Sequence, residues 1–426
     1  EGRVRVRLLN ASDREVSVPT LTPLATVDCR WNWADGGAPV RRKGKALRDL
    51  TPEEQAIMDM VKVDPDEQLT AEQKQAVRET VAEYIDVFAI PGEPVPRTHL
   101  VKVKLELKDD AKPVKMQPAR HGPVAAAIID EQVAEMERNG VIRKSTSPWG
   151  SRVLLAQNSA GRKRLVIDLR CANAALKSMQ SPMVRADDAI DKLAGAQWLH
   201  LCDLQSAFYA LPLEEESKAV TAFVTQRGHW EFDVCPMGVT SGCEWMRMAV
   251  QAALEGCAWE FCTAFVDDVI TWASTFEQGL ARLRKVFERL RWANLGISPK
   301  KTTLFATSVT FLGHVVGREG VKPCPEKIKV IKDIDPKGIN TLTKVQSFLG
   351  LCSYYRRMVA SFSVIAYPLT QLCRKGIDVP KESQQPEVQA AILALREALC
   401  TAPVLMLPRL DGRKFYVQTD ACASQG

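Results

Sequence analysis

Apolar residues recur along the chain at two spacings, one typical of amphipathic helices and one typical of strands. Helical spacing predicts helices over residues 70–88, 123–140, 244–254, 280–290, 325–333, 341–361 and 388–399. Alternation or short apolar runs predict strands over residues 4–9, 16–27, 100–107, 153–156, 165–168, 198–204, 221–224, 230–234, 311–316 and 415–419, and a hairpin within 263–273. Because helices and strands are interleaved, we expect α/β or α+β layering rather than a helical bundle.

Breaks in this pattern indicate how the chain is divided. At 426 residues it is too long for one ordinary core, so we expect roughly two to four subdomains. Residues 32–66 are rich in charge, glycine and proline and predict a mobile linker, and residues 376–386 predict a second, charged one. The chain begins with Glu-Gly and ends in mid-pattern, which is typical of a piece of something longer.

Composition narrows the class of protein and its partners. Hydrophobic residues make up 46% of the chain and charged residues 25%, as in soluble globular proteins. The 12 cysteines contain no CxxC pair and no zinc spacing, so we expect reduced thiols in the cytoplasm or nucleus. Residues 282–301 hold seven basic residues and one acidic residue, which fits either a polyanionic substrate or a solvated helix face. No apolar run approaches the roughly 18 residues that span a bilayer, so we expect no membrane partner.

Three aspartates stand where the strand pattern calls for apolar residues. Asp203 lies near the end of a predicted strand, and Asp267 and Asp268 interrupt the apolar run at 263–273. Strands are depleted in aspartate, so the adjacent pair predicts the tip of a hairpin. A solvated turn for the pair and a helix N-cap for Asp203 remain open as structural alternatives.

The three carboxylates converge if their strands are neighbours in one sheet. Such a density of negative charge is costly unless cations neutralise it. Two divalent ions about 3.5–4 Å apart would do so, and such a pair catalyses nucleotidyl transfer. Arg162, Lys163 and Arg164 follow the turn of the predicted hairpin at 153–168 and offer donors for a triphosphate. The combination predicts a template-directed polymerase, with a metal-dependent hydrolase as a less favoured alternative.

A set of ordered motifs makes this prediction specific. The motifs are SPWGS at 147–151, LVIDLR at 165–170 with Asn173, CDLQSAF at 202–208, GHWEF at 228–232, PMGVT at 236–240, FVDD at 265–268, FLGH at 311–314, SFLGL at 347–351 and YYRR at 354–357. From about residue 67 onward, the chain resembles the reverse transcriptase of gypsy-class long-terminal-repeat retrotransposon polyproteins.

The resemblance implies an α+β right-hand polymerase with fingers, palm and thumb. In such a fold Asp203 and Asp267 would hold two catalytic Mg²⁺ ions, which Mn²⁺ could replace. Asp268 would be the third palm carboxylate, and the backbone carbonyl of Leu204 would be a further metal ligand.

The resemblance also implies a nucleotide pocket. Arg164 would grip the triphosphate, and Phe208 would lie beneath the sugar and exclude a 2′-hydroxyl, so that dNTPs are preferred. Met237 and Gly238 would line the pocket. The structural alternatives are a surface charge for Arg164, core packing for Phe208 and a filler role for Met237.

The remaining parts follow in order along the chain. The resemblance places a primer grip at Phe311, Leu312, Gly313 and His314. It implies a post-protease segment and linker at 1–66, an N-terminal extension at 67–110, and fingers and palm at 111–318. The thumb and connection would cover 319–376, and 377–426 would be a linker with the truncated start of an RNase H domain.

Some residues depart from the family pattern. Phe265 stands where the family usually has tyrosine, and Gly242, Cys243 and Glu244 also differ. Asp420 resembles the first metal ligand of RNase H, but one carboxylate cannot assemble a two-metal nuclease, so no RNase H activity is expected. Because copies of mobile elements decay, a remnant that only binds nucleic acid is the alternative to an active polymerase.

The resemblance finally implies partners and a location. The partners would be an RNA or DNA template with its primer, dNTPs, and other gag and pol products of the same element. The location would be cytoplasmic, in a virus-like particle, or nuclear.

Overall fold

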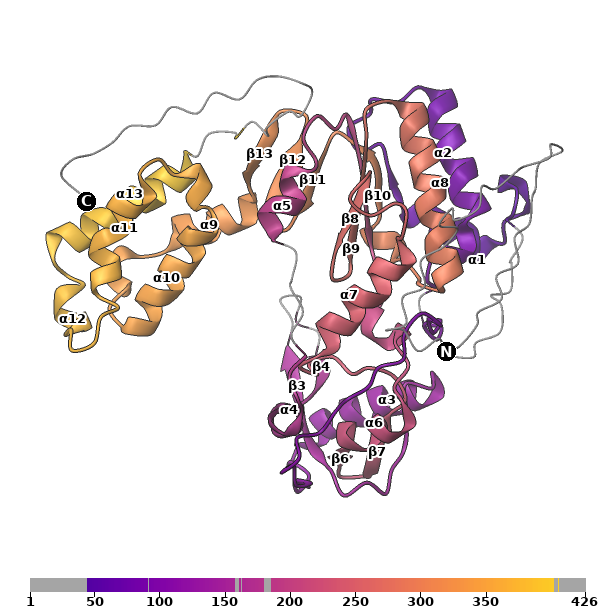
Figure 1. The fold of residues 1–426 in the computed structure, drawn as a ribbon, viewed down its shortest axis with the longest axis horizontal. Helices are drawn as coiled ribbons and strands as arrows, with labels where there is room; N and C mark the ends of the chain where they lie inside the picture. The colour runs from indigo at the N-terminus through magenta and orange to yellow at the C-terminus, as the bar shows by residue number, and fades with distance from the viewer. Residues whose placement is uncertain are drawn as a thin grey trace, which may run out of the picture.

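The computed structural model describes residues 44–401, except 91, 158–160, 162 and 180–184, together with Leu405. These residues form three β-sheets with helices packed around them (Figure 1). No helix in this part of the chain is both long and apolar enough to cross a membrane. The arrangement confirms the expected α+β class.

A five-stranded central sheet joins distant parts of the sequence. Its strands, in spatial order, are β1 (Lys62–Val63), β10 (Thr303–Ala306), β5 (Trp198–Asp203), β9 (Asp268–Ala273) and β8 (Cys262–Phe265). β5 pairs antiparallel with both β10 and β9, whereas β1 pairs parallel with β10. The strands predicted at 198–204 and the hairpin predicted within 263–273 are therefore neighbours, as the convergence of the aspartates requires.

Helices cover one face of the central sheet. α8 (Phe276–Ala293) packs on β5 and β9, and it contacts α7 (Gly242–Ala253) and α2 (Ala71–Glu83). The helix predicted at 280–290 is confirmed, because the predicted stripe of Leu283, Val286, Phe287 and Leu290 is fully buried. The Thr275 side chain caps the N-terminus of α8, and Asn294 ends the helix in the left-handed region.

A second five-stranded sheet lies below the central one in Figure 1. Its strands, in spatial order, are β2 (Ile142–Lys144), β7 (Gly228–Phe232), β6 (Phe223–Thr225), β3 (Ser151–Gln157) and β4 (Lys163–Ile167). Short helices and one long helix pack around it, namely α3 (Pro123–Arg138), α4 (Arg170–Ala175) and α6 (Glu215–Lys218). The register of β3 and β4 confirms the predicted hairpin between residues 153 and 168.

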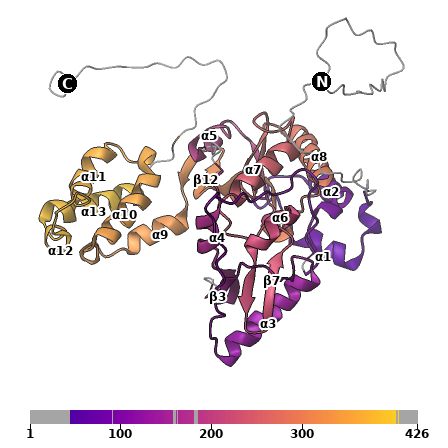
Figure 2. The same ribbon diagram turned by 60° about the horizontal axis from the view of Figure 1, so that its bottom comes forward.

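The third sheet leads into a separate helical group. It consists of β11 (Ser308–Phe311), β12 (His314–Gly317) and β13 (Gly320–Pro323), and α5 (Ala186–Asp191) lies beside it. The helices that follow are α9 (Pro325–Asp333), α10 (Leu342–Tyr354), α11 (Phe362–Gln371), α12 (Val379–Glu382) and α13 (Pro386–Cys400). Figures 1 and 2 show this group standing to one side of the rest of the molecule. Its core is continuous with the face of the central sheet that carries Leu199 and Ile270.

The N-terminal linker prediction is wrong where the structure describes it. Residues 52–60 form α1 (Pro52–Met60), and β1 follows within the segment that we expected to be mobile. The sequence held a signal for this helix, because Thr51 and Glu54 form a capping box around Pro52. Asp64 then fixes the next turn, since its carboxylate accepts hydrogen bonds from the backbone N–H groups of Gln68 and Leu69.

The strand predicted at 100–107 is also wrong, although its burial pattern is right. Val101, Val103 and Leu105 are buried in alternation, but their segment has only isolated bridges and joins no ladder. The Leu105 N–H donates to the Ser217 hydroxyl rather than to a neighbouring strand. The alternation of apolar residues therefore predicts which side chains face the core, but it does not predict the hydrogen-bond partners of the backbone.

Three further expectations change near the C-terminus. The helix predicted at 341–361 ends at Tyr354, and a second helix, α11, begins after Ser361, which has a φ of 53°. The strand predicted at 311–316 is interrupted by a two-residue turn at Leu312 and Gly313. The linker predicted at 376–386 contains α12, and Val379 is buried. The strands predicted at 4–9, 16–27 and 415–419 lie outside the described residues.

His200 is an ionisable group inside the central sheet. Its side chain is fully buried, and Nδ1 accepts a hydrogen bond from the Phe305 N–H at 3.0 Å. The Nε2 atom has no partner among the described residues. Burial disfavours the charged imidazolium and lowers the pKa of His200 to about 3.

We expect His200 to make the stability of the fold depend on pH. As the pH falls through the ordinary pKa of 6.5, the unfolded imidazole gains a proton, whereas the folded one, with a pKa of about 3, stays neutral. The unfolded state then binds more protons, so about 2 kcal/mol of stability is lost between about pH 7.5 and 5. Urea unfolding at both pH values measures this loss. His200→Gln should lack that contribution, and equal pH dependence in both proteins would contradict the assignment.

Candidate active site

The three aspartates meet at one end of the β5–β9 pair. The register sets Asp203 directly opposite Asp268, and Asp267 lies in the turn that joins β8 to β9. The Leu204 N–H donates to the Asp267 carbonyl at 2.8 Å, which ties the chain leaving β5 to that turn. The convergence predicted from the strand pattern is therefore present.

The carboxylates perturb one another. Burial, followed by the charges of Asp267 and Asp203, raises the pKa of Asp268 to about 6. Burial also raises the pKa of Asp203, and a neighbouring ammonium opposes that rise. These half-buried groups therefore resist carrying full negative charge without a cation nearby.

Lys301 places a positive charge at the acidic site. Its ammonium lies 2.9 Å and 3.1 Å from the two carboxylate oxygens of Asp203. The sequence pattern does not single out Lys301 as a site residue, because it belongs to a basic tract with no distinguishing motif. The signal that could have found it is the pairing of β10 with β5, since Lys301 lies two residues before the start of β10.

Both turns at the acidic site hold a residue with positive φ that is not glycine. Val266 has a φ of 57° in the turn that carries Asp267, and Ser206 has a φ of 46° just after β5. A β-branched residue is a true outlier in this region, at a cost of about 1–3 kcal/mol. Surrounding contacts hold the backbone in these conformations, which fixes the directions of the neighbouring side chains.

The predicted nucleotide-pocket residues also gather. A guanidinium nitrogen of Arg164, in β4, contacts the sulfur of Met237. Asn173 donates to the Gly238 carbonyl at 2.8 Å and accepts from the Thr240 N–H at 3.0 Å. Asn173 thus holds the loop that contains Met237 and Gly238 in place.

Phe208 lies against the first residue of α7. A Cβ at Gly242, the first residue of α7, would lie 3.3 Å from the Phe208 ring, so glycine leaves room for the aromatic side chain. Burial, followed by the charges of Glu244 and Asp267, raises the pKa of the thiol of the neighbouring Cys243. The unusual Gly242–Glu244 segment therefore lies against Phe208 and near Asp267.

The predicted primer-grip residues form a tight turn on the neighbouring sheet. Phe311 pairs with His314 across the antiparallel β11 and β12, with Leu312 and Gly313 between them. Phe311 is buried in the core that also contains Leu199 of β5. The strand that leads into the turn is thus anchored to the face of the central sheet that carries Leu199. Asp420, the predicted RNase H residue, lies outside the described residues, as does Arg162.

Most of the basic tract on α8 holds helices together, which neither of our two interpretations foresaw. Arg289 donates to the carbonyls of Ala252 and Ala253 at the C-terminus of α7. Arg291 donates to the Glu83 carbonyl at the C-terminus of α2 and pairs with Asp86. Arginine is suited to this role, because its charge favours the negative end of a helix dipole. These side chains are engaged within the protein.

Comparison with known proteins decides the family. Residues 143–316 match the family model described as Reverse transcriptase (RNA-dependent DNA polymerase). The chain is 31% identical over 354 residues to the retrovirus-related Pol polyprotein from transposon 412 of Drosophila melanogaster. It is 27% identical over 368 residues to the Pol polyprotein from transposon gypsy of the same fly. This is a reverse transcriptase region of the gypsy class.

The reverse transcriptase region is shorter than these relatives. Each alignment covers 82% of this chain, but they cover 28% and 35% of the relatives. The chain therefore spans about a third of the length of the curated proteins it matches.

Solved structures confirm the fold. A foamy viral protease–reverse transcriptase in complex with dsDNA has a TM-score of 0.72 at 21% identity, covering 87% of this chain and 75% of that one. The same protein in complex with an RNA/DNA hybrid has a TM-score of 0.70 at 21% identity, covering 83% and 46%. The reverse transcriptase region therefore has the expected right-hand polymerase fold, and its central sheet is the palm.

Replacing Arg289 tests whether the basic tract is structural. We expect Arg289→Met to lower the free energy of unfolding by about 1–2 kcal/mol, because two helix-terminal carbonyls lose a charged donor. Lys300→Met is the matched control, since this exposed residue of the same tract makes no hydrogen bond or ion pair through its side chain with the described residues and should change stability by less than about 0.5 kcal/mol. Urea unfolding of both variants measures the difference. Equal stabilities would instead indicate a solvated helix face.

Proposed function

We propose that this chain is an RNA-directed DNA polymerase that adds dNTPs to a primer 3′-hydroxyl by two-metal-ion nucleotidyl transfer. The observation that carries the proposal is the acidic site, where Asp203 and Asp268 face each other across β5 and β9 with Asp267 beside them. Membership of the reverse transcriptase family supports it. The proposal concerns this region and not the whole polyproteins that it resembles.

The donor set fits a hard divalent cation. Among the described residues, no group of three or more His, Cys, Asp or Glu side chains is already arranged around a metal position. The raised pKa of Asp268 and the Lys301 ammonium at Asp203 nevertheless indicate that this site favours added positive charge. Carboxylate and carbonyl oxygens are the ligands that Mg²⁺ and Mn²⁺ prefer.

We propose that Asp203 and Asp267 hold both Mg²⁺ ions, with Asp268 as the third carboxylate and the Leu204 carbonyl as a further ligand. Such ions, when bound, activate the attacking oxygen and stabilise the leaving one. Lys301 would have to release Asp203 first. Its side chain is 66% exposed, so the ammonium can move into water at small cost.

The chain's own residues would orient the nucleotide. Arg164 is exposed beside Met237, where its guanidinium can bind the triphosphate with two parallel hydrogen bonds. Asn173 would keep Gly238 close to the incoming nucleotide by holding the loop through two hydrogen bonds. Phe208 would lie beneath the sugar and exclude a 2′-hydroxyl.

The proposed partner is a primer annealed to an RNA or DNA template. The structural neighbours were solved with dsDNA and with an RNA/DNA hybrid, which supports a duplex partner for this fold. The turn at Phe311–His314 would position the primer end. Other gag and pol products remain proposed partners, and a virus-like particle or the nucleus remains the proposed location.

Asp267→Asn tests the proposed chemistry. We expect the wild-type chain to extend a DNA primer on an RNA template with Mg²⁺ and dNTPs. The variant should lose on the order of a thousandfold in rate, because one charged ligand is removed. Gel-based primer extension measures this, and omission of Mg²⁺ should also stop extension.

Asp333→Asn is the matched control, because this exposed aspartate at the end of α9 lies outside the acidic site. Full primer extension by Asp267→Asn would contradict the assignment of this aspartate to the catalytic site. If the wild-type chain binds primer–template in a salt-sensitive way but never extends it, the alternative of a binding-only remnant holds instead.

Phe208→Val tests sugar selection. A smaller side chain leaves room for a 2′-hydroxyl, so rNTP incorporation should rise about tenfold to a hundredfold relative to dNTP incorporation. The measurement is the ratio of kcat/KM for the matched rNTP and dNTP. A general loss of activity changes both values equally, so the ratio isolates selection. An unchanged ratio would leave Phe208 as a packing residue.

A further inference from the structure

The turn between β11 and β12 is held in an unfavourable conformation. Leu312 has a φ of 47° and Gly313 a φ of 67°. Two positive φ values in a row are typical of the tight turns that asparagine and glycine favour. Glycine adopts this conformation freely, but a leucine there costs about 1–3 kcal/mol. Other contacts must therefore keep this turn, the Leu312-Gly313 turn, in place.

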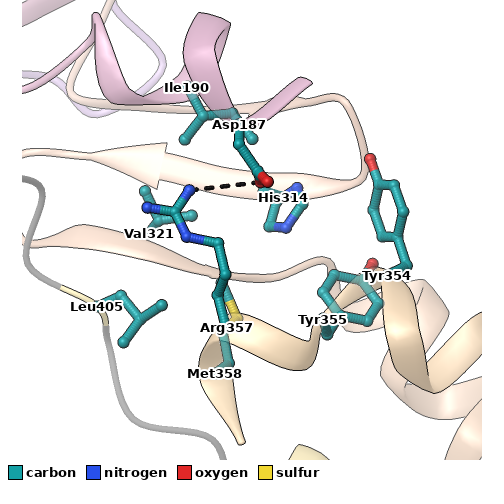
Figure 3. Close-up of a pocket in the computed structure, with 9 residues that line it drawn as sticks. All are labelled: Asp187, Ile190, His314, Val321, Tyr354, Tyr355, Arg357, Met358 and Leu405. Atoms are coloured by element: carbon teal, nitrogen blue, oxygen red, sulfur yellow. Dashed lines mark ion pairs between the residues drawn. The ribbon is translucent and has the colours of Figure 1, made fainter. Parts of the chain in front are cut away.

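Two consecutive tyrosines at the end of α10 supply such contacts. The Tyr354 hydroxyl donates to the Leu312 carbonyl at 2.6 Å, and the Tyr355 hydroxyl donates to the Gly313 carbonyl at 2.7 Å. Figure 3 shows both rings beside the turn, with His314 facing them. The centroid of the His314 ring lies 5.2 Å from that of Tyr354 and 5.1 Å from that of Tyr355.

Each of these carbonyls also accepts a second hydrogen bond that does not come from α10. The Leu312 carbonyl accepts one from His314 Nδ1 at 2.8 Å. The Gly313 carbonyl accepts one from the Cys324 N–H at 3.0 Å. Loss of a tyrosine hydroxyl would therefore leave no carbonyl without a partner, and the fold would keep its local hydrogen bonding. What would be lost is the connection between the turn and α10.

The segment that follows α10 is also linked to α5 by ion pairs. Arg357, just after the two tyrosines, pairs with Asp187 at 3.4 Å (Figure 3). It also pairs with Asp191 at 3.2 Å, and both aspartates belong to α5. A cavity of about 250 Å³ lies among these residues. These directed contacts thus surround a cavity at the edge of the apolar core that the helical group shares with the central sheet.

We infer that Tyr354 and Tyr355 are positioning residues. They couple the orientation of the helical group that contains α10 to the placement of the primer end. The inference rests on the proposed function, because it takes the Leu312-Gly313 turn as the contact for the primer. The Tyr354 side chain is 48% exposed, and it reaches the turn through its hydroxyl bond to Leu312 and the contact of its ring with His314. When α10 moves on a bound duplex, the two hydroxyls carry the turn with it.

The test removes the hydroxyls and keeps the rings. The double variant Tyr354→Phe/Tyr355→Phe is compared with the wild-type chain, and Tyr367→Phe is the control because this tyrosine is exposed on α11. Hydrogen exchange of residues 311–315 reports the turn without any need for catalysis. Single-nucleotide extension gives kcat, and fluorescence anisotropy gives the Kd for primer–template.

We expect exchange in the turn to be about tenfold faster in the double variant, because local opening becomes easier. We expect kcat to fall about tenfold through misplacement of the primer end, with the Kd within about twofold of the wild-type value. Adding Leu312→Asn should restore slow exchange, because asparagine tolerates positive φ. Tyr367→Phe should match the wild type in all three measurements.

Unchanged exchange in the double variant would overturn the inference, as would an unchanged kcat when the wild type is active. A rise in Kd with no fall in kcat would also overturn it, because the tyrosines would then only help to grip the duplex. If the wild-type chain extends no primer, the proposed function fails and the role in primer placement falls with it. The exchange measurement still decides separately whether the hydroxyls hold the turn.

Discussion

Mutual repulsion among three carboxylates is the constraint on which the palm depends. The pairing of β5 with β9 forces Asp203 against Asp268, and burial removes much of the water that would screen them. Lys301 offsets part of this charge from the end of an adjoining segment. The helices on the back of the sheet hold the strands together, and the arginines of α8 hold those helices to one another. A cation bound at the acidic site would therefore reduce the repulsion among the three carboxylates.

Backbone strain accompanies this electrostatic strain. Ser206, Val266 and Leu312 all have positive φ, and each lies in a turn next to a residue assigned to the proposed chemistry. Such conformations persist only when surrounding structure determines them. The Leu204–Asp267 hydrogen bond and the tyrosine hydroxyls on the Leu312-Gly313 turn are contacts of this kind. The site is thus held rigid by parts of the chain that carry no chemistry themselves.

The sequence predicted the elements better than their partners. The proximity of Asp203 and Asp268 could be predicted from the sequence, because strand periodicity and a hairpin signal are local features. Lys301 could not, because its carboxylate partner lies 98 positions away and nothing local marks the pairing. Arg289 and Arg291 bind backbone carbonyls, which leave no trace in a residue pattern. The tyrosine contacts were hidden for the same reason. The capping box at Thr51 was readable, but the charged composition around it favoured a linker.

The short strand β1 has a consequence for the edge of the palm. It pairs parallel with β10, matching Lys62 to Thr303 and Val63 to Leu304, and the Asp66 carboxylate accepts hydrogen bonds from the N–H and hydroxyl of Thr307. An uncovered β10 would present free backbone groups that could pair with another chain. The segment before residue 67 thus guards the sheet against self-association. Any shortened version of this protein that begins beyond it would be prone to aggregate through the palm.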